Sequence, residues 1–158
     1  MSNNVIVTYG DPIMSPVLIP VEHTSTPSCI CKPFMVEGTR HNITAMSFGS
    51  PHGALFVDDL EDVDVPGLGA ALGTHALFPE GASIVFIQVL DKESIKARLW
   101  QRGEGEAAFT PEAACVAGTT SIICQKIFSD KVSISMGGNT YNMRWDRSDE
   151  VVTLTAPA

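Results

Sequence analysis

The sequence predicts an α+β fold in which a curved, mostly antiparallel sheet wraps around one central buried helix. Three observations predict it: short runs rich in β-branched and aromatic residues fill most of the chain, turn residues separate these runs, and one long segment carries no charge. The length of 158 residues suits one ordinary domain, so we expect residues 1–158 to form a single unit. With 44% hydrophobic and 18% charged residues, the composition is that of a globular protein.

Strands are predicted wherever β-branched or aromatic residues are flanked by Gly, Pro, Asp or Asn. The segments that meet this description are Val5–Thr8, Asn42–Ser47, Ala54–Val57, Ser83–Leu90, Ile95–Trp100, Val132–Met136, Tyr141–Trp145 and Val151–Thr155. The stretch from Pro12 to Pro33 is irregular and contains several prolines, and there we expect an edge strand at Val17–Val21.

The last hairpin is the clearest of the strand predictions. Apolar and polar residues alternate along Val132–Met136 and again along Tyr141–Trp145, as in strands with one buried face. Between them lies Gly137–Asn139, whose residues tolerate the positive φ of a tight turn. Ser83–Leu90 is instead apolar almost throughout, which indicates a strand buried on both faces.

Two helices interrupt the strands. The first, at about Val65–Thr74, has Asp64 as its N-cap and a proline in its first turn. The second is predicted over Pro111–Gln125, because Thr110 supplies a hydroxyl cap and proline needs no N–H at the first helical position. After Glu112 this helix carries no charged residue, and a helix that is apolar around its circumference is buried.

Charge and hydropathy exclude some partners. The net charge of −8 argues against nucleic acid and against an anionic membrane surface, because both bind basic footprints. No apolar run approaches the roughly 20 residues that span a bilayer. The first residues show no basic stretch followed by an apolar one, so we expect a cytoplasmic protein without a secretory signal.

The four cysteines are expected to be thiols. The spacing of Cys29 and Cys31 is closer than that of most zinc sites, and no second pair completes a site, so we expect neither a metal nor another cofactor. Cys115 and Cys124 lie in the most apolar stretch and are predicted to be buried, since a free cysteine behaves as a small hydrophobe.

Four ordered motifs resemble the diaminopimelate epimerase family. Residues 47–52, followed by Phe56-Val57, resemble that family's Ser-Met-Gly-Asn-Pro-His…Phe-Val motif, and residues 78–83 resemble Phe-Pro-x-Gly-x-Asn. Residues 100–106 are similar to Glu-Arg-Gly-x-Gly-Glu, and the end of the chain from Trp145 resembles the family's final strands. The resemblance runs from about Gly10 to the C-terminus. It implies one lobe, the second, of a two-lobed fold in which each lobe is a barrel-like sheet around a central helix.

The departures from the family pattern concern its catalytic and binding residues. Where the family has a catalytic cysteine, this sequence has Thr110. Where the family has two substrate-binding asparagines and a binding glutamate, this sequence has Ser50, Ser83 and Gln101. The family's histidine, arginine and glutamate are unchanged at His52, Arg102 and Glu106. The family's other catalytic cysteine belongs to a first lobe that this sequence does not match.

These departures predict that amino-acid racemase chemistry is absent. The hydroxyl of Thr110 is far too weakly acidic for the proton transfer of a thiolate near neutral pH. Pro111 removes an N–H from the anion-binding start of the helix, and Glu112 places a competing carboxylate there. Gln101 lacks the charge that would answer a substrate ammonium group.

The remaining candidates each have a catalytic and a structural interpretation. His52 can move protons near neutrality, or can merely hold the loop after a proline turn. Glu112 can be a general base if desolvated, although the sequence favours a first-turn acid that interacts with the helix dipole. Arg102 can anchor a ligand or, as we lean, pair with Glu104 or Glu106. Thr110 is first of all a helix cap.

The favoured function is a repurposed enzyme that acts on a small molecule other than an amino acid, by isomerisation or cyclisation through proton transfer. His52 and Glu112 would move the protons, and the expected ligand-binding residues are Ser50, Ser83, Gln101, Arg102, Glu106 and Thr110. The alternatives are a non-catalytic binding or scaffold module and a half-enzyme that needs a partner lobe. Because Phe48, Phe109 and Pro111 would form an apolar face at the helix start, we also expect a homodimer that recreates the two-lobed arrangement.

Overall fold

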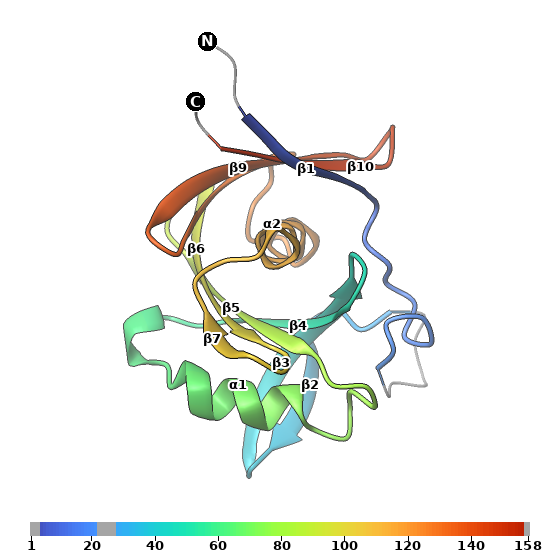
Figure 1. Ribbon diagram of the computed structural model, residues 1–158, viewed down its shortest axis with the longest axis vertical. Helices are drawn as coiled ribbons and strands as arrows, with labels where there is room; N and C mark the ends of the chain where they lie inside the picture. Colours follow the sequence, from blue (N-terminus) through green and yellow to red (C-terminus); the bar gives the residue numbers. More distant parts are fainter. Residues whose placement is uncertain (1–3, 22–27, 157–158) are drawn as a thin grey trace.

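One ten-stranded sheet curves around the helix α2 (Pro111–Ile123) in the computed structural model, which describes residues 4–21 and 28–156 (Figure 1). Its strands are β1 (Asn4–Gly10), β2 (Lys32–Val36), β3 (Thr39–Ser47), β4 (Pro51–Phe56), β5 (Ser83–Val89), β6 (Ser94–Gln101), β7 (Gly105–Ala107), β8 (Lys131–Met136), β9 (Asn139–Asp146) and β10 (Val151–Ala156). They follow the order β1-β10-β9-β8-β6-β5-β4-β3-β2, with β7 beside β6. Only β4–β5 and β6–β8 are parallel pairs, so the predicted α+β, mostly antiparallel sheet around a central helix is confirmed.

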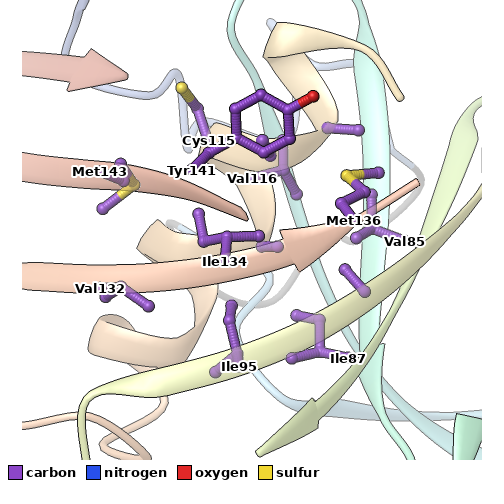
Figure 2. Close-up of a cluster of buried hydrophobic side chains, with 14 of the residues drawn as sticks. Val85, Ile87, Ile95, Cys115, Val116, Val132, Ile134, Met136, Tyr141 and Met143 are labelled. Carbon is purple, nitrogen blue, oxygen red and sulfur yellow. The ribbon is translucent and has the colours of Figure 1, made fainter. Parts of the chain in front are cut away.

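Helix α2 lies in the hollow of the sheet because its own sequence has no polar face. Thr110 is the N-cap, and Ala113 to Ser121 are buried without interruption. Figure 2 shows Cys115 and Val116 of α2 in one cluster with side chains of β5, β6, β8 and β9, among them Val85, Ile95 and Ile134. Gly118 leaves room for the thioether of Met143 from β9, which would have to move if a Cβ were added there.

Helix α1 (Val65–Gly73) covers the outer face of the sheet and completes a second hydrophobic core. Its predicted cap is confirmed, since Asp64 Oδ1 accepts a hydrogen bond from the N–H of Gly67. Gly69 and Gly73 let this helix rest on the indole of Trp100 from β6, where an added Cβ would overlap the ring. Strand β5 is therefore buried on both faces from Ser83 to Ile87, as the apolar composition of Ser83–Leu90 predicts.

The connection after β1 spans the opening between the two ends of the curved sheet. Ile13 exchanges two backbone hydrogen bonds with Ser47 of β3, of 2.8 and 3.0 Å, and Asp11 accepts one of 2.9 Å from the indole N–H of Trp145. The predicted edge strand at Val17–Val21 is wrong, because the backbone turns there and the N–H of Val21 bonds back to the carbonyl of Pro16. At this end of the sheet the edge strand is β2, which pairs with β3. Sequence patterns indicated neither β2 nor the short β7.

The cysteine predictions hold in part. Cys29 and Cys115 are free and buried, whereas Cys31 and Cys124 form a disulfide, so the expectation of thiols is wrong for this pair. Cys124 is also only half-buried, because it caps the exposed C-terminal end of α2. These two cysteines are 93 positions apart, and only the pairing of β2 with β3 brings the first of them to the end of the helix. Neither helix in the described part of the chain is long and apolar enough to cross a bilayer.

Candidate functional site

Three predicted site residues lie at neighbouring strand ends on the face of the sheet that carries α2. His52 of β4 pairs in register with Ser83 of β5, and Ile84 pairs with Trp100, which brings Gln101 to the level of Ser83. Side chains alternate between the faces of a strand, and Ala54, Val85 and Leu99 all belong to the core around α2. His52, Ser83 and Gln101 are each two positions away from one of these core residues. Their side chains therefore lie on the same face of the sheet.

The first turn of α2 lies against this row. The hydroxyl of Ser50 donates a hydrogen bond of 2.8 Å to Oε2 of Glu112. Thr110 acts as the predicted cap, because its hydroxyl accepts the N–H of Ala113 at 3.1 Å, and its carbonyl accepts the N–H of Ala114. The N–H groups of Ala113 and Ala114 are therefore already hydrogen-bonded within the helix, and Pro111 has no N–H. Few backbone donors are left at this helix start to bind an anion.

His52 is held by the same loop residue that contacts Glu112. Its Nδ1 lies 3.0 Å from the carbonyl oxygen of Ser50, which can only accept, so Nδ1 carries the proton and Nε2 of the neutral ring has the lone pair. The side chain is only 3% exposed. Burial lowers the pKa of His52, while the Ser50 carbonyl and the charge of Glu112 oppose that shift. The imidazole is accordingly a neutral base near pH 7.

Arg102 and Glu106 do not join this group. Glu106 forms a bidentate ion pair with Arg98, whose guanidinium also donates to the carbonyl of Leu60, on the face of the sheet that carries α1. Arg102 extends to the turn before β5, where Nη1 donates to the carbonyl of Glu80 at 3.0 Å. The expected pairing of Arg102 with Glu104 or Glu106 is therefore replaced by a backbone contact, and Glu106 pairs with another arginine. The backbone N–H of Arg102 donates to Oγ of Ser83, and the charge of its guanidinium contributes to the lowered pKa of His52.

Aromatic rings flank the start of α2. Phe109 stacks on Tyr141 with ring centroids 4.3 Å apart, and Phe48 packs at 5.1 Å against Tyr9 of β1. Phe48, Phe109 and Pro111 are thereby half-buried, and the apolar face expected here is smaller than the sequence suggested. Burial, followed by the charge of Glu112, raises the pKa of the Tyr9 hydroxyl, which places Tyr9 near the site. No sequence pattern links Tyr9 to Glu112, because β1 reaches this region only through the curvature of the whole sheet around α2.

Cys115 is the thiol nearest in sequence to Thr110, and it cannot replace the catalytic cysteine that the family has at that position. Cys115 lies inside α2, fully buried among core side chains, and not at its exposed start. Burial, with a smaller contribution from Glu112, raises the pKa of Cys115 to about 12, so it is a protonated thiol near neutral pH. In residues 4–21 and 28–156, no three His, Cys, Asp or Glu side chains are grouped closely enough to hold a metal ion.

The arrangement therefore combines a neutral imidazole, a carboxylate hydrogen-bonded to a serine, and the hydroxyl and amide groups of Ser83 and Gln101. Such groups can accept and return a proton and can hydrogen-bond a polar ligand. They offer no thiolate and no basic side chain directed to an anion.

Comparison with known proteins identifies the lineage of this fold. The family model described as diaminopimelate epimerase matches residues 44–158. The diaminopimelate epimerase of Oceanobacillus iheyensis is 32% identical over 157 residues, covering 99% of this chain and 54% of its own length. That of Leptospira biflexa is 31% identical, covering 98% of this chain and 54% of its own length.

The chain thus spans about half the length of the curated relatives it matches. Among solved structures, a phenazine biosynthesis protein of the PhzF family from Bacillus anthracis aligns with a TM-score of 0.51 at 19% identity, covering 75% of this chain and 46% of that one. This likeness supports the fold alone. On the match of the family model, which covers most of the sequence, the chain belongs to the diaminopimelate epimerase family.

Proposed function

We propose that this chain is an epimerase-family lobe that binds a small molecule at the start of α2 and transfers a proton with His52 and Glu112, without acting as an amino-acid racemase. The observation that carries the proposal is the double use of Ser50. Its carbonyl orients the imidazole at 3.0 Å and its hydroxyl orients the carboxylate at 2.8 Å. A base and a second proton-transfer group are thereby held by one loop residue.

The division of roles follows from the hydrogen bonds. With Nδ1–H committed to the Ser50 carbonyl, Nε2 of His52 is the atom that would accept a proton from the ligand. Glu112 would return a proton to the ligand, or its negative charge would stabilise the imidazolium that forms on His52. This pair supports an isomerisation or a cyclisation, in which a proton leaves one ligand atom and returns to another.

The ligand class follows from what surrounds the pair. A carboxylate ligand would meet Glu112 at a helix start whose N–H groups of Ala113 and Ala114 are already bonded. The proposed ligand is therefore neutral or cationic, with a weakly acidic C–H or O–H group. Ser83 and Gln101 lie in the same row and would hydrogen-bond its polar atoms.

A thermal-shift screen tests the proposal, because a ligand that binds only the folded chain raises its apparent stability. The library should hold neutral carbonyl compounds, amines and, as the disfavoured class, carboxylates. Hits are then incubated in deuterated water, and proton exchange is followed by NMR. We expect exchange that His52→Gln and Glu112→Gln reduce by about a hundredfold, while the matched controls His41→Gln and Glu93→Gln keep it.

The competing candidate is a non-catalytic binding or scaffold module, and the burial of His52 favours it. In that case the imidazole only holds the β3–β4 turn. The two candidates differ in one readout. If hits bind equally well to His52→Gln and show no exchange in any variant, the chain is a module; if exchange depends on both residues, it is an enzyme.

We further propose that the face at the start of α2 contacts a second copy of this chain. The aromatic side chains there support a two-lobed assembly built from two copies. A partner lobe from another protein is the alternative, and it would not restore racemase chemistry, since Thr110 stands at the thiol position in this lobe. Light scattering at micromolar concentration distinguishes them, with a homodimer expected and a monomer contradicting the proposal.

The cytoplasm is the proposed location. Half of the cysteines, Cys29 and Cys115, are free and buried, unlike the fully paired sets of small disulfide-rich secreted domains. Fractionation of cells that express the tagged protein tests this, and recovery outside the cytoplasmic fraction would contradict it.

A further inference from the structure

A basic groove borders the Cys31–Cys124 disulfide at the end of α2 opposite to the candidate site. The groove has a volume of about 420 Å³ and is lined by both cysteines together with Arg40, His41 and Lys126, among other residues. Its lining includes no aspartate or glutamate. The chain as a whole has a net charge of −8, so the groove reverses the prevailing charge.

The cations of the groove are available to a ligand. Neither Arg40 nor Lys126 takes part in the two ion pairs found in the described part of the chain, which are Arg98–Glu106 and Arg144–Asp130. Lys126 lies over the ring of Phe56, with Nζ 5.4 Å from its centroid, which keeps the ammonium beside the groove. A small anion that enters would meet two positive charges next to a sulfur–sulfur bond.

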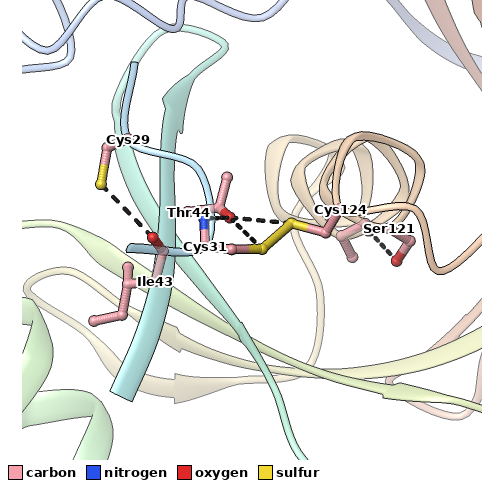
Figure 3. Close-up of a disulfide and its surroundings, with 7 residues drawn as sticks. Cys29, Cys31, Ile43, Thr44, Ser121 and Cys124 are labelled. Atoms are coloured by element: carbon pink, nitrogen blue, oxygen red, sulfur yellow. Dashed lines mark hydrogen bonds between the residues drawn. A yellow bond between two sulfur atoms is a disulfide. The ribbon is translucent and has the colours of Figure 1, made fainter. Parts of the chain in front are cut away.

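The disulfide is also equipped to release a thiolate. Figure 3 shows the hydroxyl of buried Thr44 beside both sulfur atoms, 3.3 Å from Sγ of Cys124 and 3.7 Å from Sγ of Cys31. The same oxygen accepts the backbone N–H of Cys31 at 2.9 Å, which directs its proton toward the sulfurs. Such a donor stabilises the negative charge that forms on a departing sulfur. Cys31 is exposed and Cys124 is half-buried, so Cys31 is the accessible point of attack.

We propose that Cys31 and Cys124 form a thiol–disulfide exchange site whose basic groove recruits small anionic thiols. The thiolate attacks Sγ of Cys31, the bond to Cys124 breaks, and its electron pair leaves on Sγ of Cys124, which takes a proton from water. A second small-molecule thiolate attacks the small-molecule sulfur of the mixed disulfide. The thiolate of Cys31 leaves and takes a proton from water. Two thiols are oxidised to their disulfide, and the protein disulfide is reduced to two thiols.

Reduction disconnects the beginning of β2 from the end of α2. The link joins positions 93 residues apart, so its loss releases a large constraint on the unfolded chain, and we expect the melting temperature to fall by roughly 10 °C. The exchange site is independent of the proposed proton-transfer function, because it shares none of its residues.

Thiols of different charge test the proposal on the oxidised full chain. The probes are 3-mercaptopropionate, 2-mercaptoethanol and cysteamine, which are anionic, neutral and cationic. Each rate constant is divided by that of the same thiol with bis(2-hydroxyethyl) disulfide, which removes differences in intrinsic reactivity. We expect the normalised rate of 3-mercaptopropionate to exceed that of 2-mercaptoethanol about tenfold, with cysteamine slowest and the preference lost near 0.5 M salt. Peptide mapping should find the adduct on Cys31.

Matched variants assign the preference to the groove. Arg40→Gln/Lys126→Gln should remove it, and Lys92→Gln/Lys131→Gln, with the same change in net charge, should keep it. Thr44→Val should slow all three thiols about tenfold without changing their order, and Thr44→Ser should restore the rate. Equal normalised rates in the unaltered protein, a preference that survives in the groove variant, or an adduct on Cys124 would each overturn the proposal.

Discussion

The hydroxyl of Ser50 donates to Oε2 of Glu112 across 2.8 Å, although the two residues are 62 positions apart in the chain. The contact joins the β3–β4 turn to the first turn of α2. Both positions differ from the family pattern, which has an asparagine in the place of Ser50 and a threonine in that of Glu112. The two departures thus complement each other in one hydrogen bond.

Replacement of Ser50 by alanine should lower the free energy of unfolding by about 1 to 2 kcal/mol, because the partly buried carboxylate of Glu112 loses its donor. The measurement is urea denaturation at neutral pH. Ser148→Ala, in an exposed turn, serves as the control and should leave the stability unchanged. A Ser50→Ala protein as stable as the control would show that the contact contributes nothing.

The stability of the protein should depend on His52 at mildly acidic pH. Burial lowers the pKa of His52 in the folded chain below its value of about 6.5 in the unfolded chain. Between these two values the unfolded state binds a proton that the folded state does not, so stability decreases as the pH falls below about 6.5. Denaturation at a series of pH values should show this decrease, and His52→Gln should lack that part of it. An identical pH profile for the variant would contradict the assignment.

Racemase chemistry should be absent. Incubation with amino acids in deuterated water is expected to give no exchange of the α-proton above background, since Thr110 stands at the thiol position and Cys115 is a buried thiol with a pKa raised to about 12. Thr110→Cys should not restore exchange, because Pro111 and Glu112 still obstruct an anion at the helix start. Exchange that disappears in Thr110→Ala would refute this interpretation.

An acid in the middle of α2 should prevent folding. Val116→Asp places a charge in the fully buried inner core, at a cost of several kcal/mol, which is comparable to the whole stability of a domain. Val17→Asp introduces the same residue at a position that is 84% exposed and should leave the protein folded. Circular dichroism of the soluble fraction compares the two, and a folded Val116→Asp protein would contradict the architecture.

Two neighbouring threonines of α2 should respond in opposite directions to valine. In the described part of the chain, the hydroxyl of Thr120 is the one buried side-chain polar atom without a hydrogen-bond partner, so Thr120→Val should raise the free energy of unfolding by about 1 kcal/mol. Thr119 donates to the carbonyl of Cys115 at 2.7 Å, so Thr119→Val should lower it by a similar amount. Thermal denaturation measures both, and equal shifts in one direction would contradict the expectation.

The sequence by itself determined the local elements. Thr110, Pro111 and the uncharged stretch after Glu112 specify a capped and buried helix, because caps, a first-turn proline and missing polar faces act within a few residues. Alternation specifies the hairpin of β8 and β9 for the same reason. The candidate site was predictable as far as family motifs reach, which includes His52 and Ser83.

Only the tertiary structure decided which of the candidate residues meet. The ion pair of Glu106 with Arg98, the nearness of Tyr9 to Glu112 and the pairing of Cys31 with Cys124 all depend on strand order and register. Arg102 follows the last residue of β6, where alternation along the strand no longer predicts a direction. Contacts of this kind join residues far apart in the chain, and local propensity contains no information about them, because strand order and register bring the residues together.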